Sequence, residues 1–200
     1  MPLSAPVERK LLHLRDIELR GYERSDGLFD IEAHLVDRKT TVHNDEDPDA
    51  TVPAGRPIHG MWLRLVVDVD MVVQACEASS DFTPYDICPG AAPNFSKLAG
   101  LKIGPGFNRH VAERVGGTHG CTHLRELLGQ MATVAFQTLY PVRRAREKAL
   151  LAKVASGEAP VPAAMPALLG TCIAYAPDSP VSLARWPHLA NAAETAETSR

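Results

Sequence analysis

The chain has 200 residues, of which 45% are apolar and 22% are charged, and its formal net charge is −3. This composition is typical of a globular domain with a sizeable core, and it excludes the basic surface that nucleic-acid binding usually requires. The most apolar stretch is interrupted by Asp68 and Asp70, so it falls far short of the roughly 20 apolar residues of a membrane span. The N-terminus lacks the apolar core of a signal peptide. We therefore expect a cytoplasmic protein of bacterial type, without nucleic-acid or membrane partners.

The first half of the chain predicts an antiparallel meander of about four strands, each of ordinary length. Residues 11–23 form the first predicted strand, and Ser25-Asp26-Gly27 supplies a turn signal. Residues 29–35 then alternate between apolar and polar, as a half-buried strand does. These two strands predict a hairpin.

Residues 58–70 give the clearest strand pattern, because every second residue from Met61 to Val69 is apolar. The apolar character continues over 71–79, which predicts a second antiparallel pair with a tight bend near Asp68-Val69-Asp70. The intervening segment 40–56 carries acidic residues and prolines without periodicity. We expect it to be an exposed loop.

After residue 82 the pattern changes to helices. Residues 94–98 and 106–115 are predicted to form short helices, and a long one begins at about Thr122 with apolar residues at helical spacing. Pro141 predicts a kink or a restart, followed by a helix over 142–156. Strands followed by helices indicate an α+β fold, with the helical half packed on one face of the sheet.

We expect residues 1–156 to form a single α+β domain. Residues 157–200 begin with an Ala/Pro/Gly-rich linker. A late strand over Leu168–Tyr175 and a flexible tail from Ala190 complete the predicted organisation.

The most informative motif runs from Gly116 to Leu124, with the sequence GGTHGCTHL, where a glycine-rich loop enters a helix. The first turn of a helix has unpaired N–H groups and a positive dipole end. A thiol placed there, as Cys121 is, loses its proton more easily and becomes a nucleophile or a metal ligand. His119 and His123 flank this thiol and are candidates to exchange its proton. We therefore predict catalytic roles for Cys121, His123 and His119.

Other residues are candidates for binding. Gly117 and Gly120 allow the backbone to approach a substrate closely, His59 and Trp62 could line a pocket, and Asp70 could act as acid or base. Cys88 and Asp86 lie on the irregular crossing after the strands, and together with Cys121 and His123 they make an alternative metal-ligand set. The simpler alternatives remain open: a glycine pair is often only a helix cap, and a cysteine is often a small buried apolar residue.

The stretch from about Arg56 to Gln137 resembles the DUF2889 family of uncharacterised bacterial proteins. The matching residues are Val67, Val69, Asp70, Asp86-Ile87-Cys88, Leu98–Ile103, Gly106-Phe107, Gly116-Gly117 and Gly120–Leu128. The resemblance implies that the site lies at the start of the long helix, and the family name implies no activity. In plan, the chain is also similar to iron–sulfur cluster scaffold proteins, although their cysteine spacing is absent.

Two main hypotheses follow. The first is a small-molecule metabolic enzyme, a lyase or hydrolase in bacterial catabolism of an organic acid or aromatic compound, that uses the Cys/His site. The alternative is a metal-binding or iron–sulfur carrier that uses Cys88, Cys121 and His123, with a divalent metal or a cluster as cofactor. A third is an assembly partner whose loop is only structural. A small-molecule substrate is the expected partner in the first case, and a homodimer is an assembly that the sequence permits.

Overall fold

The computed structural model describes residues 3–44, 51–160, 166 and 168–187. The chain divides into two compact units, 1–147 and 148–200, and the division falls inside the long helix, whereas the predicted domain ended at residue 156. The first unit contains the sheet and the helices that cover it. The second contains a short 3₁₀ helix, η3 (Ile173–Tyr175), and the helix α3 (Pro180–Arg185).

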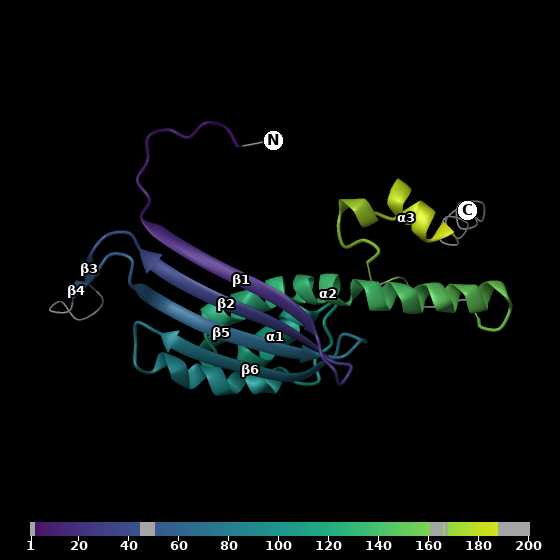
Figure 1. Ribbon diagram of the computed structural model, residues 1–200, viewed down its shortest axis with the longest axis horizontal. Coiled ribbons are helices and arrows are strands. Elements are labelled where there is room, and N and C mark those ends of the chain that lie inside the picture. Colours follow the sequence, from purple (N-terminus) through teal and green to yellow (C-terminus); the bar gives the residue numbers. More distant parts are fainter. Residues whose placement is uncertain (1–2, 45–50, 161–165, 167, 188–200) are drawn as a thin grey trace. The chain divides into compact units, whose positions relative to one another are not determined.

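The first unit is built on a four-stranded antiparallel sheet in the order β1-β2-β5-β6 (Figure 1). Its strands are β1 (His13–Glu23), β2 (Phe29–Lys39), β5 (Pro57–Val67) and β6 (Val73–Phe82). The strands follow one another along the chain, as the predicted meander requires, and the helices come after them. The α+β prediction is therefore confirmed.

The segment between β2 and β5 differs from the expected loop. His43–Asn44 (β3) pairs with Thr51–Val52 (β4) as a two-stranded antiparallel ribbon. Because β2 and β5 are already antiparallel neighbours, the chain that joins them can continue the ladder for a few residues. The acidic tip at 45–50 lies outside the described residues.

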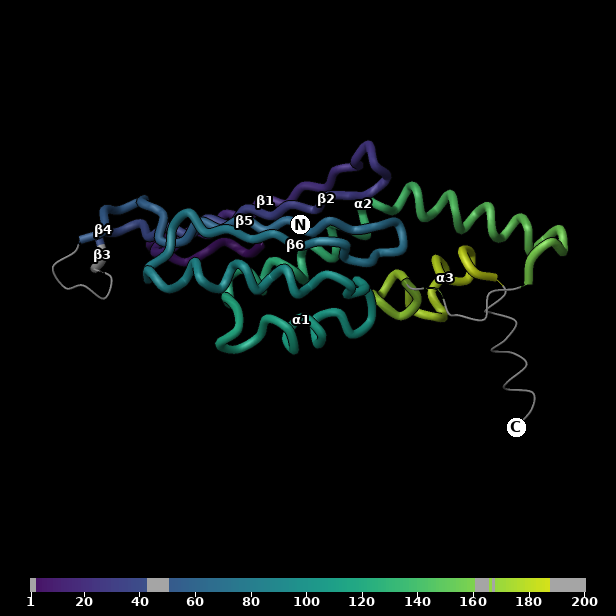
Figure 2. Tube along the Cα trace, turned by 90° about the horizontal axis from the view of Figure 1, so that it is seen from below, coloured from purple at the N-terminus to yellow at the C-terminus, as the bar shows by residue number. Residues whose placement is uncertain are grey.

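Four helical elements follow the sheet within the described residues up to 155: η1 (Cys88–Leu98), α1 (Phe107–Val115), η2 (Gly117–His119) and α2 (Thr122–Ala155). Figure 2 shows η1 and α1 on one side of the sheet. The core lies between that side and the helices, and its largest fully buried side chains include Phe95, Leu124 and Met131.

The later elements differ from two expectations. Pro141 does not restart the long helix, since α2 continues through it as one element, although an interior proline removes one intrahelical hydrogen bond and crowds the preceding turn. Residues Leu168–Tyr175 form turns and η3 instead of a strand, with Gly170 at a φ of 75° and its N–H bonded to the carbonyl of Tyr175. The tail from Ala190 lies outside the described residues.

Candidate functional site

The helix-facing side of the sheet ends in a row of polar residues. Arg15 of β1 is directly opposite Asp37 of β2, and Asp37 is directly opposite His59 of β5. Since side chains alternate between the two faces of a strand, these three continue the apolar rows that form the core. The next row inward pairs Leu35 with Met61, which are both buried. The polar row therefore closes one end of the core.

Asp37 is the centre of this row, and only 1% of it is exposed. Arg15 donates from Nε to Oδ1 at 2.7 Å and from its terminal NH2 to Oδ2 at 2.8 Å. His13 Nε2 lies 3.1 Å from Oδ1, and His59 Nδ1 lies 3.1 Å from Oδ2. Burial opposes ionisation of Asp37, but the hydrogen bonds from Arg15 and His13 outweigh it and lower the pKa to about 2. Asp37 is therefore a fixed buried anion.

The loop before α2 brings the helix start to this row. Gly117 has a φ of 56°, a region that favours glycine. A Cβ on Gly120 would overlap the carbonyl oxygen of Val115, so the backbone there packs directly against the end of α1. These glycines shape the loop that presents Cys121.

Cys121 precedes the first residue of α2, and its thiol is partly buried. Its Sγ lies 3.8 Å from Nδ1 of His123 and 3.9 Å from the sulfur of Met61. Burial alone would raise the pKa of this thiol. The hydrogen bond with His123, together with the backbone N–H groups of Leu124 and His123, outweighs burial, and the pKa falls below its ordinary value.

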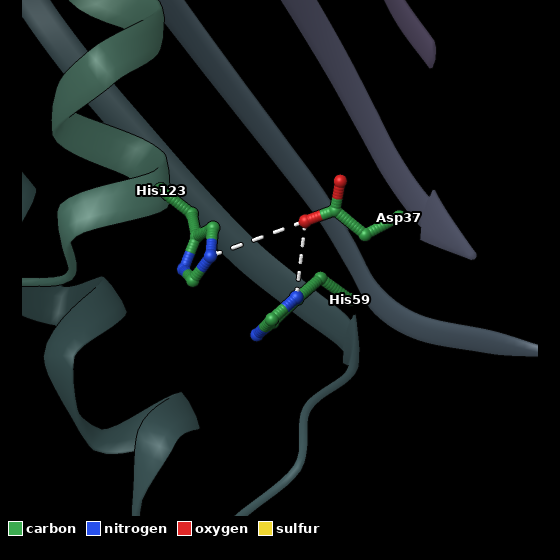
Figure 3. Close-up of side chains that lie close together, drawn as sticks. All are labelled: Asp37, His59 and His123. Atoms are coloured by element: carbon green, nitrogen blue, oxygen red, sulfur yellow. Dashed lines mark hydrogen bonds and ion pairs between the residues drawn. The ribbon is translucent and has the colours of Figure 1, made fainter. Parts of the chain in front are cut away.

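His123 lies between the thiol and the buried carboxylate. While Nδ1 faces Cys121, Nε2 lies 3.9 Å from Oδ2 of Asp37 (Figure 3). Its ring also packs against that of His59, with 3.9 Å between ring centroids. The hydrogen bond with Cys121 raises the pKa of His123. Burial, and then the neighbouring His123, lower the pKa of His59. The pKa values of the two imidazoles are thus shifted in opposite directions, so His123 favours its protonated form more than His59 does.

Three of these side chains could share a metal ion. One ligand atom each from Asp37, His59 and His123 lie within 4.8 Å of one another. The expected set was different, because within the described residues neither Cys88 nor Asp86 belongs to such a group. Cys88 begins η1, on the chain segment that leaves β6, while Asp86 is exposed just before it.

The remaining predicted site residues lie apart from the cluster. His119 is exposed, and its backbone carbonyl accepts a hydrogen bond from the side chain of Asn94. Trp62 points to the opposite face from His59, where it stacks on His34 and lines a groove with Glu32 and Pro93. His59 and Trp62 therefore do not line one pocket, as was expected. They are three residues apart on β5, and side chains an odd number of residues apart on a strand face opposite sides of the sheet.

Asp70 lies at the other end of β5, in the turn to β6, and pairs with Arg146 at 3.4 Å. The eight residue-to-residue steps along the strand from His59 to Val67 correspond to roughly 26 Å at about 3.3 Å per step. Asp70 is therefore too distant to act on a molecule bound at Cys121.

Sequence reasoning missed Asp37, Arg15 and His13 as members of the site. Glu126, three residues after His123 on α2, accepts a hydrogen bond from the guanidinium of Arg15 at 2.9 Å. A signal was present in the alternation itself. Phe29, Ile31, Ala33 and Leu35 define the buried face of β2, and Asp37 continues that period of two. A carboxylate that follows the alternation of the buried residues points toward the core, and a buried carboxylate needs an oppositely charged or hydrogen-bonding partner.

The fold and the site define an α+β protein with a thiol and imidazole cluster at a helix start. Comparison with known families gives a match over residues 13–137 to the model described as "Protein of unknown function (DUF2889)", and the chain belongs to this family. The match begins at His13 and contains the whole cluster, with all of β1 and β2. No curated protein and no solved structure matches the chain. Within the described residues, no helix is both long enough and apolar enough to cross a membrane.

Proposed function

We propose that the protein is an enzyme of the hydrolase class that acts on a small organic molecule, with Cys121 as its nucleophile. The observation that carries this proposal is the position of the Cys121 sulfur, between the first N–H groups of α2 and Nδ1 of His123 at 3.8 Å. A thiolate is the reactive form of cysteine, and both neighbours favour it. Cys76 gives a contrast, since burial raises the pKa of that thiol to about 12.

In the proposed reaction, the Cys121 sulfur attacks a carbonyl carbon and forms a thioester. The bond to the leaving group breaks, and the leaving group takes its proton from His123, which holds the proton given up by the thiol. Water then attacks the thioester, His123 accepts the proton from water, and the acid and free thiol are restored. Asp37 orients the His123 ring from the other side and stabilises its charged form.

The substrate class that suits this chemistry is an ester, thioester or amide of an organic acid. The positive end of the α2 dipole lies beside Cys121, and it favours an anion or a developing oxyanion. An aromatic acid derivative in bacterial catabolism is the narrower form of this proposal. A lyase would use the same Cys121 and His123 as base and acid. A screen of candidate substrates distinguishes this second reaction class from hydrolysis.

The experiment is hydrolysis of p-nitrophenyl acetate by metal-free protein. We expect a burst of p-nitrophenolate of up to one equivalent per chain, lost in Cys121→Ala and reduced at least about 100-fold in rate in His123→Ala. Cys172→Ala is the matched control, because Cys172 is exposed and lies in the other unit. An equal burst in Cys121→Ala would exclude this thiol as the nucleophile and favour an assembly partner with a structural loop.

The alternative carrier function through Cys88, Cys121 and His123 has less support. Its four ligands, including Asp86, do not form a close group among the described residues. A thiol enzyme, in contrast, requires only the contacts of Cys121 with His123 and of His123 with Asp37, which the described residues make.

A further inference from the structure

We propose that Asp37, His59 and His123 also form a binding site for one divalent transition-metal ion of the Zn²⁺ type. Two imidazoles and a carboxylate are a common donor set for such ions. The three residues come from β2, β5 and the first turn of α2, and Figure 3 shows their side chains converging on one point.

The distances suit coordination of a single ion. Oδ2 of Asp37 lies 3.1 Å from Nδ1 of His59 and 3.9 Å from Nε2 of His123. Around a tetrahedral ion with bonds of about 2.0–2.1 Å, neighbouring ligand atoms are roughly 3.3–3.4 Å apart. The two observed separations lie on either side of this value, so small side-chain rotations bring all three atoms to the ion.

Arg15 does not block the ion, although it holds both oxygens of Asp37. Each carboxylate oxygen has two acceptor positions, and Oδ2 uses one for Arg15 and the other for Nδ1 of His59. The ion takes the place of the proton between Oδ2 and His59. Arg15 and His13 then remain as the outer partners that orient the ligand, an arrangement common around bound metals.

The charge and exposure of the cluster also allow entry. The Arg15 guanidinium is balanced by Asp37 and by Glu126, which it bonds at 2.9 Å, so the dication does not meet a net positive environment. The side chain of Asp37 is 1% exposed, whereas those of His59 and His123 are 14% and 25% exposed. The carboxylate is thus a fixed anchor, and the ion arrives from the side of the imidazoles. The Cys121 sulfur is not a member of this group.

The ion would regulate the proposed reaction, and this step rests on the proposed function. A neutral imidazole has one lone pair on its ring nitrogens. When Nε2 of His123 binds the ion, its proton must be on Nδ1, which faces Cys121. His123 can then donate a hydrogen bond to the sulfur, but it can no longer accept the proton of the thiol or of water. Occupation of the site would therefore stop turnover.

The test is titration of the chelator-treated full chain with Zn²⁺ by calorimetry, and with Co²⁺ by visible absorption. We expect one ion per chain. Binding should be at least about 100-fold weaker in His59→Ala and in His123→Ala, since loss of a residue that only orients a ligand typically weakens metal binding about ten- to hundredfold. Cys121→Ser and the matched control His110→Ala should bind as the wild type does, since His110 pairs with Glu113 on an exposed helix face. Circular dichroism verifies that each variant folds.

Three results would overturn the metal site: no binding by the wild type, undiminished binding by both histidine variants, or loss of binding in Cys121→Ser. One equivalent of Zn²⁺ should also lower p-nitrophenyl acetate turnover at least tenfold, and unchanged turnover in the Zn²⁺-bound protein would overturn the regulatory step. If the protein shows no esterase activity, the proposed enzyme fails, but the metal titration still decides the site.

Discussion

Arg15 and Asp37 occupy directly opposite positions on β1 and β2, and the guanidinium holds both oxygens of the carboxylate at 2.7 and 2.8 Å. Paired charges of this kind, in line with a core row, close the end of the sheet where α2 begins. The same guanidinium bonds Glu126 of α2 at 2.9 Å. One side chain therefore connects the edge strand, the buried anion and the helix that carries His123.

Replacing Arg15 should destabilise the protein. In Arg15→Ala, Asp37 stays buried and loses its two strongest hydrogen bonds, and breaking a buried ion pair costs about 3–5 kcal/mol. Because Arg15 is 32% exposed and His13 and His59 remain beside the carboxylate, we expect a loss of about 2–3 kcal/mol in the free energy of unfolding. Urea unfolding at pH 7 measures it as a lower midpoint with an unchanged slope.

Arg20→Ala is the matched control for this prediction. Arg20 lies on the same strand, pairs with Glu18 and is more than half exposed, so its removal should change stability little. Equal losses in the two variants would contradict the structural role of the Arg15–Asp37 pair.

The stability of the wild type should decrease in acid through Asp37. Its pKa is lowered from 3.8 to about 2 in the folded chain. A depressed pKa contributes stability that is fully present above the unfolded value, and this contribution is lost as the pH falls toward the folded value. Allowing for solvent around the partly exposed partners, this amounts to about 1–2 kcal/mol between pH 5 and 2. Between pH 5 and 2, the free energy of unfolding should fall more steeply with decreasing pH in the wild type than in Asp37→Asn. Equal slopes in the two proteins would contradict this prediction.

Much of the fold could be predicted because local patterns decide it. Alternation marks β2 and β5, and the inward residues of β5, Met61 to Val67, are buried as expected. The stripe on α2 is also buried at Leu124, Leu128 and Met131. The ribbon of β3 and β4 was missed, since its pairing is a consequence of its neighbours and not of its own composition.

The site was only half predicted for a related reason. Cys121 and His123 are close in sequence, so their spacing alone indicates a pair at a helix start. Asp37 and His59 reach them only through strand register and the docking of α2, which periodicity does not specify. Cys88 was included because its residue type suits a metal, but among the described residues it does not belong to a group of three or more possible metal ligands.

The pH dependence of Cys121 alkylation tests its contact with His123. Since the pKa of this thiol is lowered and that of His123 is raised, modification by iodoacetamide should reach half its maximal rate below the pH typical of a free cysteine. In His123→Ala the midpoint should move up, because the hydrogen bond to the sulfur is lost. Rates for Cys121 are obtained by mass spectrometry of its peptide.

His119→Ala is the control for the alkylation profile, because it removes a nearby imidazole that is exposed. Its profile should match that of the wild type. If the midpoint moved as far in His119→Ala as in His123→Ala, the loop rather than the 3.8 Å contact would control the thiol.

Gly120→Ala should disturb the presentation of Cys121 through packing. The added Cβ would overlap the backbone carbonyl oxygen of Val115 at the end of α1, and a backbone atom cannot rotate away as a side chain can. We expect a loss of about 1–3 kcal/mol, as for overpacked sites, and slower alkylation of Cys121 as the loop moves away from His123. Gly90→Ala is the matched control, since no heavy atom lies within 4 Å of its added Cβ. A Gly120→Ala protein with unchanged stability and unchanged thiol reactivity would mean that the loop can shift without moving the sulfur.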